Sequence, residues 1–142
     1  MQINPFRLER YFAKYEFKAP YLLCASDCES MTIAELFRME KDAAAQFEQL
    51  WLGYGESAGH PDLRAAIASL YTDTSADEIL VHTGAEEAIF IAMNVLLKKG
   101  DHVIVHSPCY RSLKEVAVAI GCRLTLWEAD PQRDWSLDID VL

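Results

Sequence analysis

The sequence predicts an α/β fold in which an N-terminal helical segment precedes a β-α-β-α-β series of mainly parallel strands. Two patterns predict this class. From residue 79 onward, short β-branched and apolar runs alternate with longer runs whose apolar residues recur at helical spacing, which is typical of parallel strands covered by helices on both faces. Before residue 60, apolar residues recur at helical spacing alone and then give way to closely spaced glycines. We therefore expect helices first and the sheet second.

The first half of the chain has two recognisable helix starts. Asn4 precedes Pro5, and this pair favours a helix start because Asn caps free amides and proline fits the first helical position. Thr32 and Glu35 have the spacing of a capping box. The expected elements are a helix from Pro5 to about Tyr15, a helix after Thr32 that either continues or restarts through Ala43 to Leu50, and a loop over residues 51–59.

Proline and glycine also delimit the elements of the second half. Pro61 favours another helix start, and Gly100 interrupts the apolar pattern between a helix and a strand. The acidic stretch over residues 129–142 is expected to be mostly loop. The predicted strands are Ile79–Thr83, His102–His106 and Arg123–Trp127, and the predicted helices are Pro61 to about Leu70, Glu86–Lys98 and Arg111–Ile120.

Composition narrows the classes of function. The chain has 142 residues, 51% of them hydrophobic, which is the size of one domain with enough apolar residues for a core. A formal net charge of −9 argues against nucleic acid as a partner. No stretch approaches the roughly 20 apolar residues of a membrane span, and the start lacks a signal-peptide pattern. We therefore expect a cytoplasmic protein. Its four cysteines and four histidines lack metal-ligand spacing, so no metal site is expected.

The turn after the first predicted strand contains the clearest candidate for ligand binding. Gly84, Ala85 and Glu86 join that strand to a helix, and the free amides at a helix start bind phosphate well. Tyr110 follows the next strand, where its ring could lie against an aromatic group attached to that phosphate. The pair suggests a phosphorylated aromatic cofactor. The alternatives are an ordinary strand-to-helix glycine and a tyrosine that only covers the end of a strand.

Three separated motifs resemble one family. TGAEEAI followed by LLKKGDHVIVHSPCY is similar to the cofactor-binding core of class I/II aminotransferases, which are fold-type-I pyridoxal-phosphate enzymes. LGYGESAGHPDLRAAIASLY resembles the segment before their large domain, and PFRLERYFAKYEFKAPYLLCASDCES resembles the N-terminal part of a subgroup. The resemblance implies two regions: residues 1–60 as an N-terminal arm and helices of the small domain and inter-domain segment, and residues 61–142 as the first part of a three-layer α/β/α, pyridoxal-phosphate-binding large domain.

The resemblance also implies roles for individual residues. Gly84, Ala85 and Glu86 correspond to the phosphate-binding turn, although many relatives carry a neutral residue in place of Glu86. Tyr110 corresponds to the aromatic residue that stacks on the pyridine ring of pyridoxal 5'-phosphate. Tyr54 matches a tyrosine whose hydroxyl reaches across a dimer interface to the neighbouring cofactor phosphate. The implied assembly is a homodimer, and the implied substrates are an amino acid and a 2-oxo acid.

The family's Schiff-base lysine, the aspartate on the pyridine nitrogen and the arginine on the substrate carboxylate correspond to positions beyond residue 142. We therefore expect no catalytic residue in these 142 residues, no turnover by this chain alone, and weak or absent binding of pyridoxal 5'-phosphate to it. The alternatives are a non-catalytic truncated remnant that self-associates and part of a related pyridoxal-phosphate lyase or cyclase. A generic nucleotide-binding domain is disfavoured because the turn TGAEEA lacks GxGxxG spacing.

Overall fold

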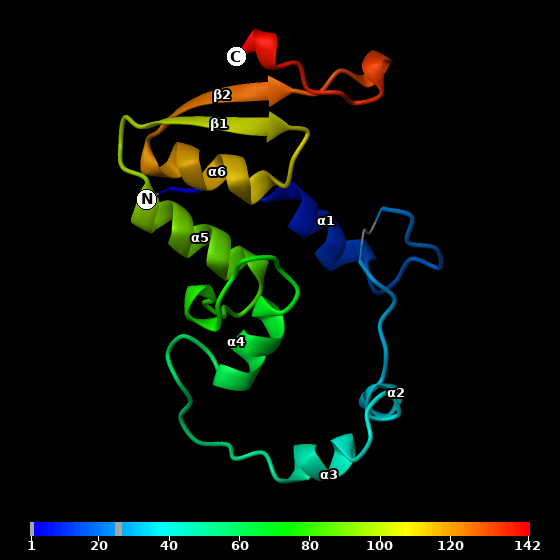
Figure 1. Ribbon diagram of the computed structural model, residues 1–142. Helices are drawn as coiled ribbons and strands as arrows, with labels where there is room; N and C mark the ends of the chain where they lie inside the picture. The colour runs from blue at the N-terminus through cyan, green and yellow to red at the C-terminus, as the bar shows by residue number, and fades with distance from the viewer. Residues whose placement is uncertain (1, 25–26) are drawn as a thin grey trace. The chain divides into compact units, whose positions relative to one another are not determined.

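The computed structural model describes residues 2–24 and 27–142, and Figure 1 shows the order of the elements along the chain. The chain forms two compact units, one made of Met1–Tyr11 with Leu80–Leu142 and the other of Phe12–Ile79. The first, which contains the sheet, is called the sheet unit below, and the second is called the helical unit.

The helical unit contains short helices joined by long irregular segments. Thr32 and Glu35 form the predicted capping box: the Glu35 amide donates to the Thr32 hydroxyl over 3.2 Å, and the Thr32 amide donates to the Glu35 carboxylate over 2.7 Å. The helix restarts after Asp42, which adopts a left-handed φ of 61°. The helices of this unit are α2 (Ile33–Phe37), α3 (Ala43–Glu48), α4 (Pro61–Ala68) and the 3-10 helix η1 (Ala76–Glu78).

Arg64 ties α4 to the segment that leaves this unit. Its Nε donates to the Ile79 carbonyl oxygen over 3.1 Å, and its Nη2 lies 3.1 Å from the Asp77 carboxylate. The Arg64 side chain is 15% exposed but that of Asp77 is 98% exposed, so water screens the ion pair and the part-buried bond to the Ile79 carbonyl is the better shielded contact. The side chain therefore fixes the backbone just before the predicted phosphate-binding turn.

The sheet unit is built on one parallel strand pair. Strand β1 (His102–Ser107) pairs with β2 (Arg123–Glu128), with His102 opposite Arg123 at one end and Ser107 opposite Glu128 at the other. Helix α6 (Arg111–Ile120) connects the strands, contacts both of them and also packs against α5 (Ala85–Leu96), as Figure 1 shows. The buried residues of this unit are Val105, Ser112, Val116, Ala117 and Ala129.

Most elements of the sheet unit agree with the sequence predictions. Helix α6 has the predicted bounds, and both strands extend one residue further than predicted. Helix α1 (Arg7–Tyr15) begins two residues later than predicted, and the Asn4 side-chain amide donates to the Glu115 carboxylate over 2.9 Å. The C-terminal segment contains only the 3-10 helices η2 (Pro131–Arg133) and η3 (Ile139–Val141).

The predicted strand Ile79–Thr83 is wrong. Within the described residues the sheet has two strands, and this segment has no strand beside it to complete a ladder. Its backbone groups take other partners: the Ile79 carbonyl accepts from Arg64, and the Thr83 amide donates to the Glu87 carboxylate over 2.6 Å. A β-branched run becomes a strand only where a neighbouring strand can pair with it.

We expect the chain to self-associate. Both strands keep an unpaired edge in the described structure, and α5 exposes Val95 and Leu96, each 76% accessible. Open edges and apolar helix faces favour association with further chains. Light scattering after size exclusion should therefore give a mass above that of one chain, and Val95→Lys should lower it.

The control for this experiment is Asn94→Lys, which adds the same charge at the neighbouring exposed polar residue of α5. This variant should associate like the wild type. A wild-type chain that stays monomeric at low micromolar concentration and unfolds cooperatively would contradict the prediction.

Candidate functional site

The candidate site begins at the Gly84 turn. Gly84 has φ 83° and ψ 164° and is the N-cap of α5. This backbone conformation strongly favours glycine. A Cβ placed there would meet no atom within 4 Å, so the space outside the turn is open to a ligand. The sequence predicted a glycine turn here, and the structure has one.

The first turn of α5 supplies the donors of the site. The amides of Ala85 and Glu86 occupy the first helical positions, where no carbonyl of the same helix can accept from them. Both residues are exposed. The positive end of the helix dipole adds to the attraction for an anion. These amides are chemically suited to hold a phosphate group.

A carboxylate of the same helix turn is directed to the preceding segment. Glu87 accepts a hydrogen bond from the Thr83 amide over 2.6 Å, and its carboxylate lies 3.7 Å from Nδ1 of His82. The Gly84 amide donates to the His82 carbonyl over 2.9 Å. Glu87 thus restrains the backbone that enters the turn, because its carboxylate interacts with Thr83 and His82.

Tyr110 is the second predicted residue of the site. It is the N-cap of α6 and follows β1 by way of a cis peptide bond between Ser107 and Pro108. Its hydroxyl donates to a Glu9 carboxylate oxygen over 3.1 Å. Its ring meets the ring of Phe6 edge-on, with centroids 5.3 Å apart and an interplanar angle of 61°. Both contacts come from the N-terminal part of the sheet unit.

The environment of the Tyr110 hydroxyl links it to the Gly84 turn. Desolvation of the hydroxyl, followed by its interactions with Glu9 and Glu86, raises the pKa of Tyr110 to about 12. Although 41% of the whole residue is exposed, the hydroxyl end is the part that titrates. Glu86, two positions after Gly84, lines a small cavity with Phe6, and Phe6 contacts the Tyr110 ring, so the predicted turn and the predicted ring lie near each other in the structure.

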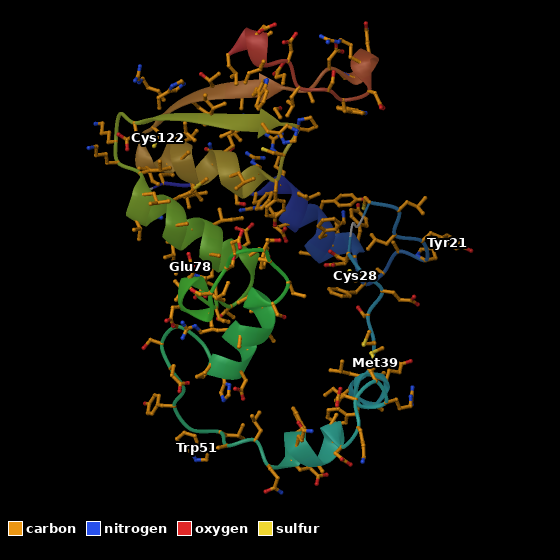
Figure 2. All side chains as sticks on the ribbon, viewed as in Figure 1. Tyr21, Cys28, Met39, Trp51, Glu78 and Cys122 are labelled. Atoms are coloured by element: carbon orange, nitrogen blue, oxygen red, sulfur yellow. The ribbon has the colours of Figure 1, made fainter. Side chains whose placement is uncertain are left out.

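Tyr54 is not part of this group of residues. It lies in the helical unit, in the loop between α3 and α4, and 99% of it is exposed. Trp51, labelled in Figure 2, projects from the same loop and is also exposed. The role of Tyr54 involves a second subunit and stays a prediction.

Sequence reasoning missed Glu9 and Phe6. Glu9 and Tyr110 are 101 positions apart, and neither residue belongs to a motif that would indicate the contact. Glu9 lies in the first turn of α1 as observed, and an acidic residue there by itself indicates only a favourable helix dipole interaction.

Other kinds of site receive no support from the described residues. Among residues 2–24 and 27–142, no group of three His, Cys, Asp or Glu side chains could hold a metal ion. No described helix is long and apolar enough to cross a bilayer. The cysteines Cys24, Cys28, Cys109 and Cys122 are free.

Residues 20–142 match the family model described as aminotransferase class I and II. Capreomycidine synthase from Streptomyces vinaceus is 29% identical over 137 residues, which cover 95% of this chain and 35% of that protein. An aspartate aminotransferase from Pyrococcus horikoshii is 33% identical over 97 residues, which cover 62% of this chain and 25% of that protein. The chain therefore spans about a third or less of the length of these curated relatives.

Solved structures of pyridoxal-phosphate-dependent enzymes also resemble this chain. A PLP-dependent aminotransferase from Streptococcus suis superposes with a TM-score of 0.89 at 27% identity, over 99% of this chain and 39% of that one. The PLP-dependent cyclase OrfR superposes with a TM-score of 0.79 at 28% identity, over 90% of this chain and 34% of that one. These likenesses confirm the predicted α/β class as part of a larger domain.

The raised pKa of Tyr110 predicts how stability depends on pH. Between pH 10 and about 12 the unfolded chain loses the phenolic proton while the folded chain retains it. The free energy of unfolding therefore decreases as the pH rises through this range. Tyr110→Phe should remove part of that decrease, as measured by urea denaturation at a series of alkaline pH values.

The matched control for the pH series is Tyr21→Phe, which removes the hydroxyl of an exposed tyrosine. The decrease in the control should resemble that of the wild type. Wild-type and Tyr110→Phe curves that run parallel over the whole range would show that the Tyr110 hydroxyl is not shielded in the folded chain.

Proposed function

Because the chain belongs to the class I and II aminotransferase family, we propose that its Gly84 turn and Tyr110 form part of a pyridoxal 5'-phosphate site. The observation that carries the proposal is their proximity, since Glu86 of the turn lines the same cavity as Phe6, whose ring contacts the Tyr110 ring. One feature supplies phosphate donors and the other an aromatic face. The reaction we propose for the whole protein is amino transfer between an amino acid and a 2-oxo acid.

The donor set fits the phosphate group of this cofactor. Open space at Gly84 lets an anion approach the backbone, and the amides of Ala85 and Glu86 would donate to the phosphate oxygens. The Tyr110 ring would stack on the pyridine ring, a contact that typically contributes about 0.5–1.5 kcal/mol beyond burial. When bound, pyridoxal phosphate supplies the electron sink of the reaction. The part played by this chain is to bind and orient it.

The negative charge of Glu86 is compatible with this role. Its carboxylate interacts with the Tyr110 hydroxyl, which is a hydrogen-bond donor, and its backbone amide remains at the helix start. The side chain and the amide of one residue would thus serve different partners. The side chain faces the start of α6, while the amide is available to phosphate.

A second candidate function uses the same site. Capreomycidine synthase and the cyclase OrfR match 95% and 90% of this chain. These two likenesses favour a pyridoxal-phosphate enzyme that closes a ring on an amino acid as the alternative to amino transfer. Both candidates need the same cofactor orientation, because one fold supports several reactions. Product analysis with the whole protein distinguishes them.

The remaining assignments follow from family membership. We propose that the protein acts as a homodimer in the cytoplasm and that the Tyr54 hydroxyl of one subunit donates to the cofactor phosphate of the other. The exposure of Tyr54 supports this role, because no residue described in its own unit covers the side chain. We assign residues 1–60 to the arm and inter-domain helices and residues 61–142 to the cofactor-binding domain.

Cofactor binding by the 142-residue chain should depend on both parts of the site. Gly84→Val forces a β-branched residue to φ 83°, which disfavours the turn, and Tyr110→Ala removes the stacking ring. Each change should weaken pyridoxal-phosphate binding, by about two- to tenfold for Tyr110→Ala. Titration of intrinsic fluorescence measures this.

Gly55→Val is the matched glycine control, because Gly55 has no positive φ and a Cβ there meets nothing within 4 Å. It should bind like the wild type. Equal affinity of the wild type, Gly84→Val and Tyr110→Ala would show that the cofactor binds elsewhere or not at all.

The 142-residue chain alone should not catalyse amino transfer. In this family a lysine attaches the cofactor and moves protons, and the resemblance assigns that role to none of the lysines of this chain. Assays with mixed amino acids, 2-oxo acids and added cofactor should match a control without protein. Turnover above that control, abolished by replacing one lysine, would refute this expectation. The lysines to replace are Lys14, Lys18, Lys41, Lys98, Lys99 and Lys114.

A further inference from the structure

The N-terminal arm, here residues 3–10, contacts the start of α6 at two places. Near its beginning, Asn4 donates to the Glu115 carboxylate over 2.9 Å, and the same carboxylate accepts from Nε of Arg111 over 3.2 Å. Further along, Glu9 accepts from the Tyr110 hydroxyl over 3.1 Å. The arm is therefore held on α6 independently of the Tyr110 contact.

The second contact restrains the orientation of the Tyr110 ring. Its hydroxyl is held by Glu9, and Phe6 lies edge-on to the ring at a centroid distance of 5.3 Å. The hydroxyl oxygen of a tyrosine lies on the axis about which the ring rotates, so the Glu9 contact restrains the direction of the side chain and the Phe6 contact restrains the rotation of the ring about that axis. With 41% of the residue still exposed, part of its surface remains accessible to a ligand.

We propose that Glu9 is a positioning residue of the cofactor site: by accepting the Tyr110 hydrogen bond, it fixes the direction of the side chain and so the place at which the ring stacks on the cofactor. This inference rests on the proposed function. Glu9 acts only through Tyr110 and does not touch the cofactor. By holding the Tyr110 side chain in place before the cofactor binds, Glu9 lowers the conformational entropy that is lost on binding.

Two carboxylates influence the Tyr110 hydroxyl, but its one hydrogen is donated to Glu9. Both Glu9 and Glu86 interact with it and contribute to its raised pKa. Glu86 belongs to the helix whose amides would bind the phosphate, so a change there would disturb the turn as well as the ring. Glu9 comes from a different helix and can be replaced without altering the turn. It is therefore the residue through which the orientation of the ring can be tested separately.

The test is a double-mutant cycle in the 142-residue chain, with pyridoxal-phosphate affinity as the measurement. Glu9→Ala should raise the dissociation constant by about three- to tenfold, which corresponds to the net contribution of one typical hydrogen bond. Tyr110→Phe keeps the ring but removes the hydroxyl. In that background Glu9→Ala should cause no further loss, because the contact it removes is already gone.

A purely structural role of Glu9 gives a different result. If Glu9 only helps the arm to fold, Glu9→Ala weakens binding equally in the wild-type and Tyr110→Phe backgrounds, and the proposal is overturned. It is also overturned if Glu9→Ala binds like the wild type while Tyr110→Ala binds weakly. That second outcome leaves the proposed function intact. A wild-type chain with no measurable affinity overturns both.

Two further variants keep the cycle interpretable. Glu9→Gln retains a hydrogen-bond acceptor of the same length, so its dissociation constant should lie between those of the wild type and Glu9→Ala. It also replaces Glu9→Ala in the cycle if circular dichroism shows that the alanine variant is unfolded. Glu48→Ala removes an exposed glutamate at the end of α3 and should bind like the wild type, which controls for the change in net charge.

Discussion

The parallel pairing of β1 with β2 is the constraint on which the candidate site depends. Parallel strands cannot be joined by a tight turn, so the chain must cross over, and α6 provides that crossover. The buried residues Val105, Val116 and Ala117 belong to this strand and helix. The crossover begins immediately after the carboxyl end of β1, and Tyr110 stands at that point as the N-cap of α6. Ligands of open α/β sheets bind at the carboxyl ends of their strands.

A second constraint on the site is electrostatic, because a chain with a net negative charge is proposed to bind an anion. The formal net charge is −9, so attraction must come from backbone amides at the start of α5. The nearby carboxylates have hydrogen-bond donors of their own: Glu87 has the Thr83 amide, and Glu9 has the Tyr110 hydroxyl. A carboxylate that accepts a hydrogen bond elsewhere competes less for the helix amides. The acidic residues thus support the site without occupying its anion-binding position.

Local signals in the sequence predicted most elements, and the failures arose where an element needs a distant partner. The capping box of Thr32 and the bounds of α6 depend on residues a few positions apart, and both predictions are confirmed. Ile79–Thr83 has the composition of a strand but no neighbour in the described sheet, so its backbone is satisfied by side chains. The Gly84 turn could be predicted because a positive φ favours glycine, so the residue at this position is itself a signal for the backbone conformation.

The contact between Glu9 and Tyr110 shows why the complete site could not be predicted from motifs. The motif around Tyr110 specifies where the ring stands along the chain, but its orientation depends on a helix more than 100 positions earlier. That helix starts in the same compact unit as the Gly84 turn, so the beginning of the chain and the cofactor-binding segment form one structure. A substitution in the arm can then alter cofactor affinity although it lies outside every cofactor motif. Under the proposed function the arm is part of the site, because Glu9 holds the hydroxyl end of the Tyr110 side chain.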